Sequence, residues 1–241
     1  MPTDVRCLVE TDESSGVVRL TGVLDSSGVG AVHDALLTRL TDRPGPVVVD
    51  LSGLRVTEPV ARDVFAEVRR EVIDWPAAEL MVCDPTGTIG GVPTWPTLDR
   101  VLAALAETPM AAVLTADLAP EVGAARQARA LVTDGCVRWG VAALAEPASI
   151  AVTEMVNNVV AHARTPMTVR LAPRDSTLHL AVRDHSARRP AFRGLAPLDS
   201  TGGRGLLLID TLARRWGSTP LPDGKVVWCV LHAEDEVAHR S

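Results

Sequence analysis

The stretch Ala151-Val-Thr-Glu-Met-Val-Asn-Asn-Val-Val-Ala-His-Ala163 decides how the second half of the chain is interpreted. Its polar residues Glu154, Asn158 and His162 recur every four positions, so on a helix they stack along one side, one turn above the next. The stretch therefore predicts a helix that carries a polar site on an otherwise apolar surface. The apolar surface is supplied by Ile150, Met155, Val156, Val159 and Val160.

The chemistry of this polar stripe suits a phosphate-bearing ligand with a divalent cation. Asn158 offers a neutral carbonyl oxygen, which suits Mg²⁺ when phosphates and waters supply the rest of an octahedral shell. Glu154 can accept a proton or orient a water, and His162 can donate a hydrogen bond to a phosphate oxygen. The alternative is a solvated polar face on an ordinary amphipathic helix. The helix alone favours that alternative, and only the glycines further along the chain favour a site.

Composition and charge limit the class of protein. The 241 residues are 46% hydrophobic and 22% charged, which describes a folded chain of one or two domains. The net charge of −6 argues against broad nucleic-acid binding, so we expect no direct DNA binding. The four cysteines form no CxxC pair, and no signal pattern or membrane-length apolar run is present. We therefore expect a cytoplasmic protein without a membrane segment.

The first hundred residues alternate strands with helices. This alternation predicts an α/β layer structure with parallel strands. The helical pattern breaks at Pro109, which places a domain boundary near residue 108. The expected strands are Val17–Leu24, Val47–Leu51 and Glu79–Cys83, and the expected helices are Val32–Leu40, Val60–Ile73 and Leu98–Ala106.

Beyond this boundary, several motifs follow one another in a fixed order. A helix is expected over Pro120–Trp139, and the polar helix is followed by a hairpin whose second strand closes on Asp184. Then Gly202-Gly-Arg-Gly-Leu206 runs into another helix. Such glycines let the backbone approach a phosphate, and a helix N-terminus presents free N–H groups to an anion. Taken alone, the glycine run indicates no more than a tight turn.

Together these motifs resemble the ATP-binding domain of the histidine kinase-like (GHKL, Bergerat-fold) superfamily over residues 118–232. The segments Leu212–Gly217 and Asp223–Trp228 narrow the resemblance to the anti-sigma factor serine kinase branch, which is common in actinobacteria. The resemblance implies a two-layer α/β sandwich over residues 109–241, with ATP and Mg²⁺ as cofactors.

The resemblance also implies a role for each motif residue. Asn158 would coordinate Mg²⁺, and Glu154 would act as general base toward an incoming serine hydroxyl. Asp184 would accept a hydrogen bond from the adenine amino group. Val226 stands where a threonine often assists that aspartate. The phosphate-side lid and helix start would be formed by Gly202, Gly203, Arg204, Gly205 and Leu206.

The N-terminal part resembles a STAS domain, the fold of anti-sigma factor antagonists, over residues 1–108. The resemblance rests on Val18-Arg-Leu-Thr-Gly-Val-Leu-Asp25 and Val47-Val-Val-Asp-Leu-Ser-Gly-Leu54. In those antagonists, a serine at the following helix N-terminus is phosphorylated. Here Val60 takes that position and Pro59 replaces its neighbour, while Thr57 and Ser52 are weak substitutes. We therefore interpret the domain as a degenerate STAS domain that serves as a scaffold or docking surface.

The combination predicts a regulator that binds Mg-ATP and phosphorylates a serine of a separate STAS anti-anti-sigma protein. It would act in a partner-switching pathway, as an ATP-dependent protein serine/threonine kinase. Its partners would be that STAS protein, a sigma factor or both, and the resemblance leaves room for a homodimer. The alternative is a non-catalytic module that senses nucleotide or sequesters such a partner. A sensor histidine kinase is disfavoured because no phosphoacceptor-histidine helix precedes the ATP domain, and length excludes a topoisomerase-type ATPase.

Overall fold

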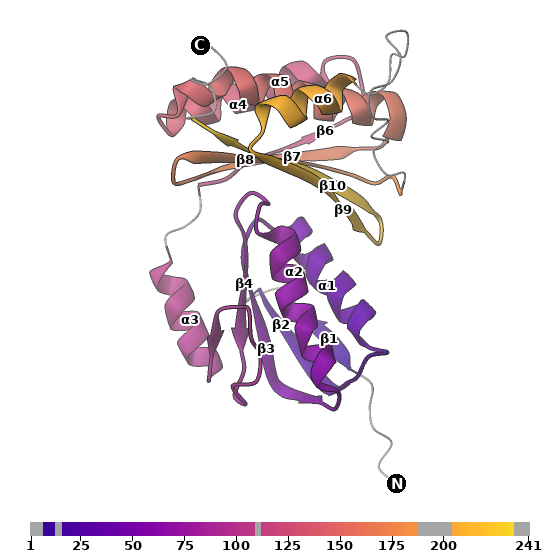
Figure 1. The fold of residues 1–241 in the computed structure, drawn as a ribbon, viewed down its shortest axis with the longest axis vertical. Coiled ribbons are helices and arrows are strands. Elements are labelled where there is room, and N and C mark those ends of the chain that lie inside the picture. The colour runs from indigo at the N-terminus through magenta and orange to yellow at the C-terminus, as the bar shows by residue number, and fades with distance from the viewer. Residues whose placement is uncertain (1–6, 13–15, 109–111, 188–203, 234–241) are drawn as a thin grey trace. The chain divides into compact units, whose positions relative to one another are not determined.

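In a computed structural model of the protein, the structure describes residues 7–12, 16–108, 112–187 and 204–233. The chain forms two compact units. The first comprises Met1–Ile73 and Ala78–Ala111, and the second comprises Asp74–Ala77 and Ala112–Ser241. Each unit has its own five-stranded sheet (Figure 1).

The sheet of the first unit has helices on both faces. Helices α1 (Val29–Asp42) and α2 (Asp63–Val72) lie on one face, and α3 (Leu98–Glu107) lies on the other (Figure 1). β1 is antiparallel to β2, and the remaining neighbours pair in parallel, as the alternation of elements predicts. The strand order is β1 (Leu8–Thr11), β2 (Val17–Leu24), β3 (Gly45–Val56), β4 (Ala78–Cys83) and β5 (Thr94–Trp95).

The central strand β3 explains how this unit is packed. Its segment Val47–Leu51 is buried throughout, because helices cover both faces of the sheet. Phe65 of α2 is fully buried, and Val101 of α3 packs beside Val48 on the other face. The strand continues to Val56, past the predicted end at Leu51, because pairing with β2 holds its more exposed second half.

The turn before α2 differs from the predicted helix over Val60–Ile73. Pro59–Arg62 forms a 3₁₀ turn, η1, and the α-helix begins only at Asp63. Val60 therefore lies on this turn with 65% of its surface exposed, away from the buried side of α2. Thr57 precedes the turn, and both its backbone N–H and its Oγ1 donate to the carbonyl oxygen of Leu24, at 3.0 and 3.3 Å.

A buried carboxylate organises the loop after β4. Asp84 is 4% exposed, and its Oδ1 accepts from the backbone N–H and the hydroxyl of Thr86 at 2.9 and 2.6 Å. Its Oδ2 accepts from the N–H groups of Thr88 and Ile89 at 2.6 and 2.8 Å. Burial alone would raise the pKa of Asp84, but these hydrogen bonds outweigh it and lower the pKa.

A histidine joins the two helices on one face of this sheet. The Nε2 of His33 on α1 lies 2.9 Å from Oε1 of Glu71 on α2, and its Nδ1 lies 3.3 Å from Oδ1 of Asp34. Partial burial disfavours the charged ring, but hydrogen bonds and charge attraction from the two carboxylates raise the pKa of His33 above its ordinary value. The imidazolium form is therefore the one that holds α1 and α2 together.

The second unit is a two-layer sandwich, as predicted. Helices α4 (Ala124–Arg138), α5 (Ala145–Asn158) and α6 (Arg204–Leu212) cover one face of its sheet (Figure 1). All neighbouring strands are antiparallel. The strand order is β6 (Leu114–Leu118), β7 (Met167–Arg174), β8 (Thr177–Asp184), β10 (Gly224–His232) and β9 (Arg215–Leu221).

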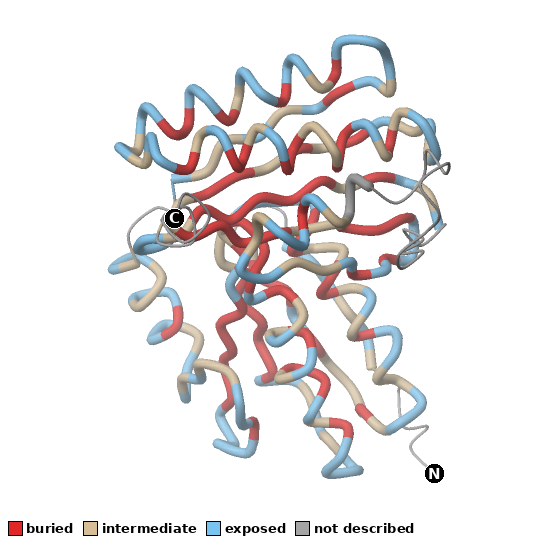
Figure 2. The backbone as a smooth tube through the Cα atoms, turned by 45° about the horizontal axis from the view of Figure 1, so that its top comes forward, coloured by how far each residue is buried: buried red, intermediate tan, exposed pale blue. Residues whose placement is uncertain are grey.

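Buried residues in the core of this unit come from the strands and from the inner sides of the helices (Figure 2). Met155 of α5 and Leu180 of β8 belong to it. The predicted helix over Pro120–Trp139 begins only at Ala124, because Gly123 has a φ of 114° and interrupts the helical backbone. Val122 is consequently exposed and does not contribute to the buried side of α4.

Among the described residues, no helix is both long enough and apolar enough to cross a lipid bilayer.

Candidate functional site

Helix α5 places Glu154 and Asn158 one turn apart, as predicted. Both residues are half-buried, while Met155 and Val156 beside them pack into the core. Within the part of the chain that the structure describes, neither polar side chain makes a hydrogen bond or an ion pair. A carboxylate and an amide are therefore available to a ligand from successive turns of one helix.

The helix changes character directly after Asn158. Residues Val159–Ala163 form a π-turn, η3, which ends at Arg164 in the left-handed region with a φ of 56°. The N–H of Arg164 closes this turn on the carbonyl of Val159 at 2.7 Å. Because a π-turn is wider than an α-turn, the four-residue repeat no longer places His162 directly above Asn158. His162 is exposed, and its phosphate-binding role stays a prediction.

The ends of β8 and β10 bring Asp184 together with Lys225, the only lysine of the chain. The two residues are register partners, and the lysine Nζ lies 2.9 Å from Oδ1 and 2.7 Å from Oδ2 of the aspartate. Asp184 is 1% exposed and Lys225 is 9% exposed, so this is a buried ion pair. Ser186 completes it, because its N–H donates to Oδ1 at 2.8 Å and its carbonyl accepts from Nζ at 3.3 Å.

The resemblance places Val226 where a threonine often lies beside the aspartate, and the strand register differs from this placement. Val226 pairs with Arg183, so strand alternation places Val226 on the opposite face of the sheet from Asp184. The β10 residue that contacts Asp184 is Lys225. The signal that could have revealed it is the register of the two strands, which a single sequence does not fix.

Gly224 is what allows the two strands to come so close. A Cβ at this position would overlap the carbonyl oxygen of Asp184 and would also lie 2.8 Å from the Cα of His185. Any side chain here would push the start of β10 away from the end of β8. Glycine is therefore required for the Asp184–Lys225 pair to form.

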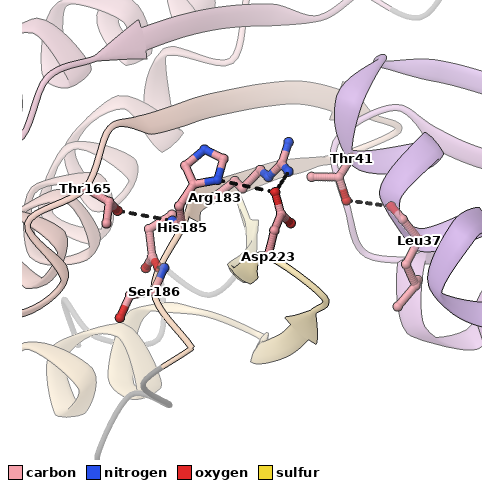
Figure 3. A network of polar contacts seen from close by, with 8 residues as sticks. Leu37, Thr41, Thr165, Arg183, His185, Ser186 and Asp223 are labelled. Atoms are coloured by element: carbon pink, nitrogen blue, oxygen red, sulfur yellow. Dashed lines mark hydrogen bonds and ion pairs between the residues drawn. The ribbon is translucent and has the colours of Figure 1, made fainter.

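Three further contacts hold the end of β8 and the residue that follows it (Figure 3). The N–H of His185 donates to Oγ1 of Thr165 at 3.1 Å, which ties this segment to the loop after the π-turn. Nη2 of Arg183 lies 2.8 Å from Oδ2 of Asp223, and Nδ1 of His185 lies 3.4 Å from the same oxygen. Asp184 is thus flanked on both sides by anchored residues.

A cavity of about 580 Å³ opens beside the ion pair. Its volume lies in the range of small-molecule sites. Trp216 stands in its wall, with its Nε1 donating to Oδ1 of Asp210 at 2.8 Å. Lys225 lines the cavity, whereas Asp184 does not. The other lining residues are Ala187, Gly217, Ser218, Pro220, Leu221 and Gly224.

The hydrogen-bonding positions of Asp184 and the possible metal ligands can be compared with what a purine nucleotide and Mg²⁺ require. A carboxylate has about four lone-pair positions, of which Ser186 and Lys225 take two on Oδ1 and Lys225 takes one on Oδ2. One position on Oδ2 remains for an amino group. Among the described residues, no cluster of three or more His, Cys, Asp or Glu side chains could hold a metal ion. Mg²⁺ held by phosphates, waters and Asn158 needs no such cluster.

The glycine motif is only partly visible. Gly202 and Gly203 lie outside the described residues. Arg204 is the first residue of α6, and Gly205 and Leu206 follow in its first turn, so the motif enters a helix as predicted. Ile209 of the same helix is fully buried in the core of the second unit.

Each of the two units contains a segment that matches a known family model. Residues 118–231 match the family described as "Histidine kinase-like ATPase domain", and residues 7–72 match "Mlab, STAS domain". These matches agree with the two resemblances drawn from the sequence. No curated protein matches the chain significantly.

Two solved structures are similar to parts of the chain. One is an anti-sigma factor antagonist from Mycobacterium paratuberculosis, at 25% identity and a TM-score of 0.34, over 44% of this chain and 97% of that one. The other is the histidine kinase domain of a blue-light activated histidine kinase from Erythrobacter litoralis EL346. It has 18% identity and a TM-score of 0.31, over 40% of this chain and 48% of that one.

Proposed function

We propose that this chain, which joins a STAS domain to a histidine kinase-like ATPase domain, is a partner-switching regulator that binds Mg-ATP and phosphorylates a serine on a separate STAS protein. The observation that carries the proposal is the pair Glu154 and Asn158. Both lie on one helix of the ATPase domain, one turn apart, and have no partner among the described residues. The regulator would act in the cytoplasm, on a sigma factor or its antagonist.

The proposed chemistry assigns one task to each group. When bound, Mg-ATP supplies the transferred phosphoryl group and the charge neutralisation that such transfer depends on. The amide oxygen of Asn158 would contribute one ligand to the metal. Glu154 takes the proton of the serine hydroxyl as the new O–P bond forms, the bond to the β-phosphate breaks and ADP leaves. Asp184 would accept a hydrogen bond from the amino group of the base, at the position on Oδ2 that no described residue uses.

The substrate serine is expected on another protein because the STAS domain of this chain lacks one at the expected place. Val60 stands there, exposed on the η1 turn, and has no hydroxyl. Thr57 is the nearest hydroxyl to it along the chain, and it donates to the carbonyl of Leu24. The exposed valine also supports a second candidate function, in which the domain is a docking surface that no phosphorylation switches off.

The test is a titration of the purified chain with ATP, with and without magnesium. Asn158→Ala should weaken Mg-ATP binding by about tenfold or more, the usual effect of losing a bond to a charged group. The neighbouring Asn157 is exposed on the same helix, so Asn157→Ala is a matched control and should bind as the unchanged chain does. An Asn158→Ala protein with unaltered Mg-ATP affinity would refute the assignment of this residue.

Kinase activity is tested separately with radiolabelled ATP and a STAS protein that carries a serine at its switch position. Transfer to that serine supports the kinase proposal. If the chain binds Mg-ATP but transfers no label to any such protein, the non-catalytic module is the better description.

A further inference from the structure

Lys225 of the buried ion pair lines the cavity. Both carboxylate oxygens of Asp184 lie within 2.9 Å of its ammonium group, and Asp184 is 1% exposed. A ligand that contacts the ammonium group therefore lies next to the carboxylate. This arrangement concerns the same site as the proposed function and rests on it.

The hydrogen bonds of the pair are unequal. The ammonium group of Lys225 is 2.7 and 2.9 Å from the two oxygens of Asp184 but 3.3 Å from the carbonyl of Ser186. The longest of these three bonds is the weakest, so its proton is the one most readily given to an acceptor on a ligand. Asp184 keeps one free lone pair on Oδ2. The pair thus offers one donor and one acceptor from neighbouring atoms.

A carboxylate alone distinguishes purines by the group at carbon 6. It accepts from a 6-amino group, whereas a 6-oxo group would place an oxygen against its negative charge and leave the buried carboxylate without its partner. An ammonium group beside the carboxylate changes this outcome, because a 6-oxo group can accept from it. The charge of Lys225 therefore removes the basis on which Asp184 would reject a 6-oxo purine.

We propose that Lys225 is a specificity-determining residue of the nucleotide site, and that the Asp184–Lys225 pair admits both 6-amino and 6-oxo purine nucleotides. The 6-amino purines use the free lone pair of Asp184. The 6-oxo purines take the proton that Lys225 otherwise shares with Ser186.

The test compares Kd values for ATP and inosine triphosphate, whose bases differ in carrying an amino or an oxo group at carbon 6. The unchanged chain should bind the two within about tenfold of each other. In Lys225→Met, the Kd for inosine triphosphate should rise by about tenfold or more relative to the Kd for ATP. The 6-oxo group has then lost a charged hydrogen-bond donor. Lys225→Gln keeps a neutral donor of similar reach and should lie between the two. Arg126→Met, which removes an exposed cation from α4, should leave the ratio unchanged.

A second measurement observes the side chain of Lys225 by NMR in the unchanged sequence, so it does not depend on whether a variant folds. Because the chain has a single lysine, ¹⁵Nζ-lysine supplied during expression labels only the ammonium group of Lys225 and leaves its three protons in place. Inosine triphosphate should shift this ammonium signal in an NMR titration.

Three results would overturn the inference. They are discrimination against inosine triphosphate by more than about a hundredfold in the unchanged chain, a ratio that both lysine substitutions leave unaltered, or a lysine signal that inosine triphosphate does not move. Each of these leaves nucleotide binding itself standing. A chain that binds neither nucleotide refutes the proposed function and this inference together.

Discussion

The buried ion pair at the end of β8 allows a quantitative prediction about stability. In Asp184→Leu, the one contact that Lys225 keeps among the described residues is the 3.3 Å bond to the carbonyl of Ser186, in a site where both residues are at least nine-tenths buried. Removing one partner of such a pair typically costs about 3–5 kcal/mol, because the other charge stays buried without compensation. The same cost is expected for Lys225→Met.

The double variant Asp184→Leu/Lys225→Met removes both charges and should cost only about 0–2 kcal/mol, because apolar pairs often replace buried ion pairs without loss. The single costs sum to about 6–10 kcal/mol, so the coupling free energy should be at least about 4 kcal/mol.

The assay has to isolate the second unit, because one bulk signal would mix two units that need not unfold together. Hydrogen exchange of peptides from β8 and β10, measured in increasing urea, reports the opening free energy of this sheet. Substitution costs that add to within about 0.5 kcal/mol would refute the reasoning, since additivity would mean that the two side chains do not depend on each other.

Three further outcomes follow from other parts of the structure. Glu154→Gln should keep Mg-ATP affinity but lower phosphoryl transfer by about 100-fold or more in single-turnover assays, since a general base acts in the transition state; equal loss of binding would contradict this role. Mass spectrometry after incubation with Mg-ATP should find no phosphate at or next to Val60, whereas stoichiometric phosphate on Thr57, lost in Thr57→Ala, would show that the switch has moved. The pKa of His33 is raised in the folded protein, so its stabilising contribution is complete below about pH 6.5 and is lost as pH rises through the folded-state value. His33→Gln should therefore reduce the difference in first-unit stability between pH 5.5 and pH 8, measured by hydrogen exchange of α1, and an unchanged difference would exclude this histidine as the cause.

The sequence alone predicted secondary structure correctly where a pattern is long and involves residues that are near one another in the chain. The alternation of strands and helices predicted the parallel sheet of the first unit, and the two arms ending at Asp184 predicted the β7–β8 hairpin. The stretch Ala151–Ala163 correctly indicated a helix with a buried apolar side. Its last turn was beyond prediction, because a π-turn depends on one extra residue per turn and leaves the apolar pattern almost unchanged.

The missed strands share a physical reason. β9 contains Gly217 and Pro220, which favour turns, but it lies at the edge of its sheet, where a proline need not donate to a neighbour. β6 is a five-residue edge strand with a polar Thr115 and Asp117, so its pattern is too short to distinguish from a loop. Short edge strands are stabilised by their neighbours more than by their own residues.

The sequence predicted which candidate residues lie close together only where those residues belong to a single helix or strand. Glu154 and Asn158 lie on one helix, and helical periodicity places them together. Lys225 was not predicted because its partner lies 41 positions earlier in the chain and is reached only through the register of two strands. The family resemblance placed Val226 at the position of the threonine, but the side chain of Val226 faces the other side of the sheet.

The glycine at the start of β10 also restricts the order in which this site can change over generations. With Gly224 in place, Asp184 and Lys225 can be exchanged for other residues while the two strands keep their separation. If Gly224 is replaced first, the two strands must move apart, and the ion pair between Asp184 and Lys225 is broken by the same substitution. A mutational library of the three positions should therefore contain tolerated changes at the charged pair on a glycine background, and few tolerated changes at the glycine on any background. Of the three residues, Gly224 is therefore the one that has to be kept while the charged pair changes.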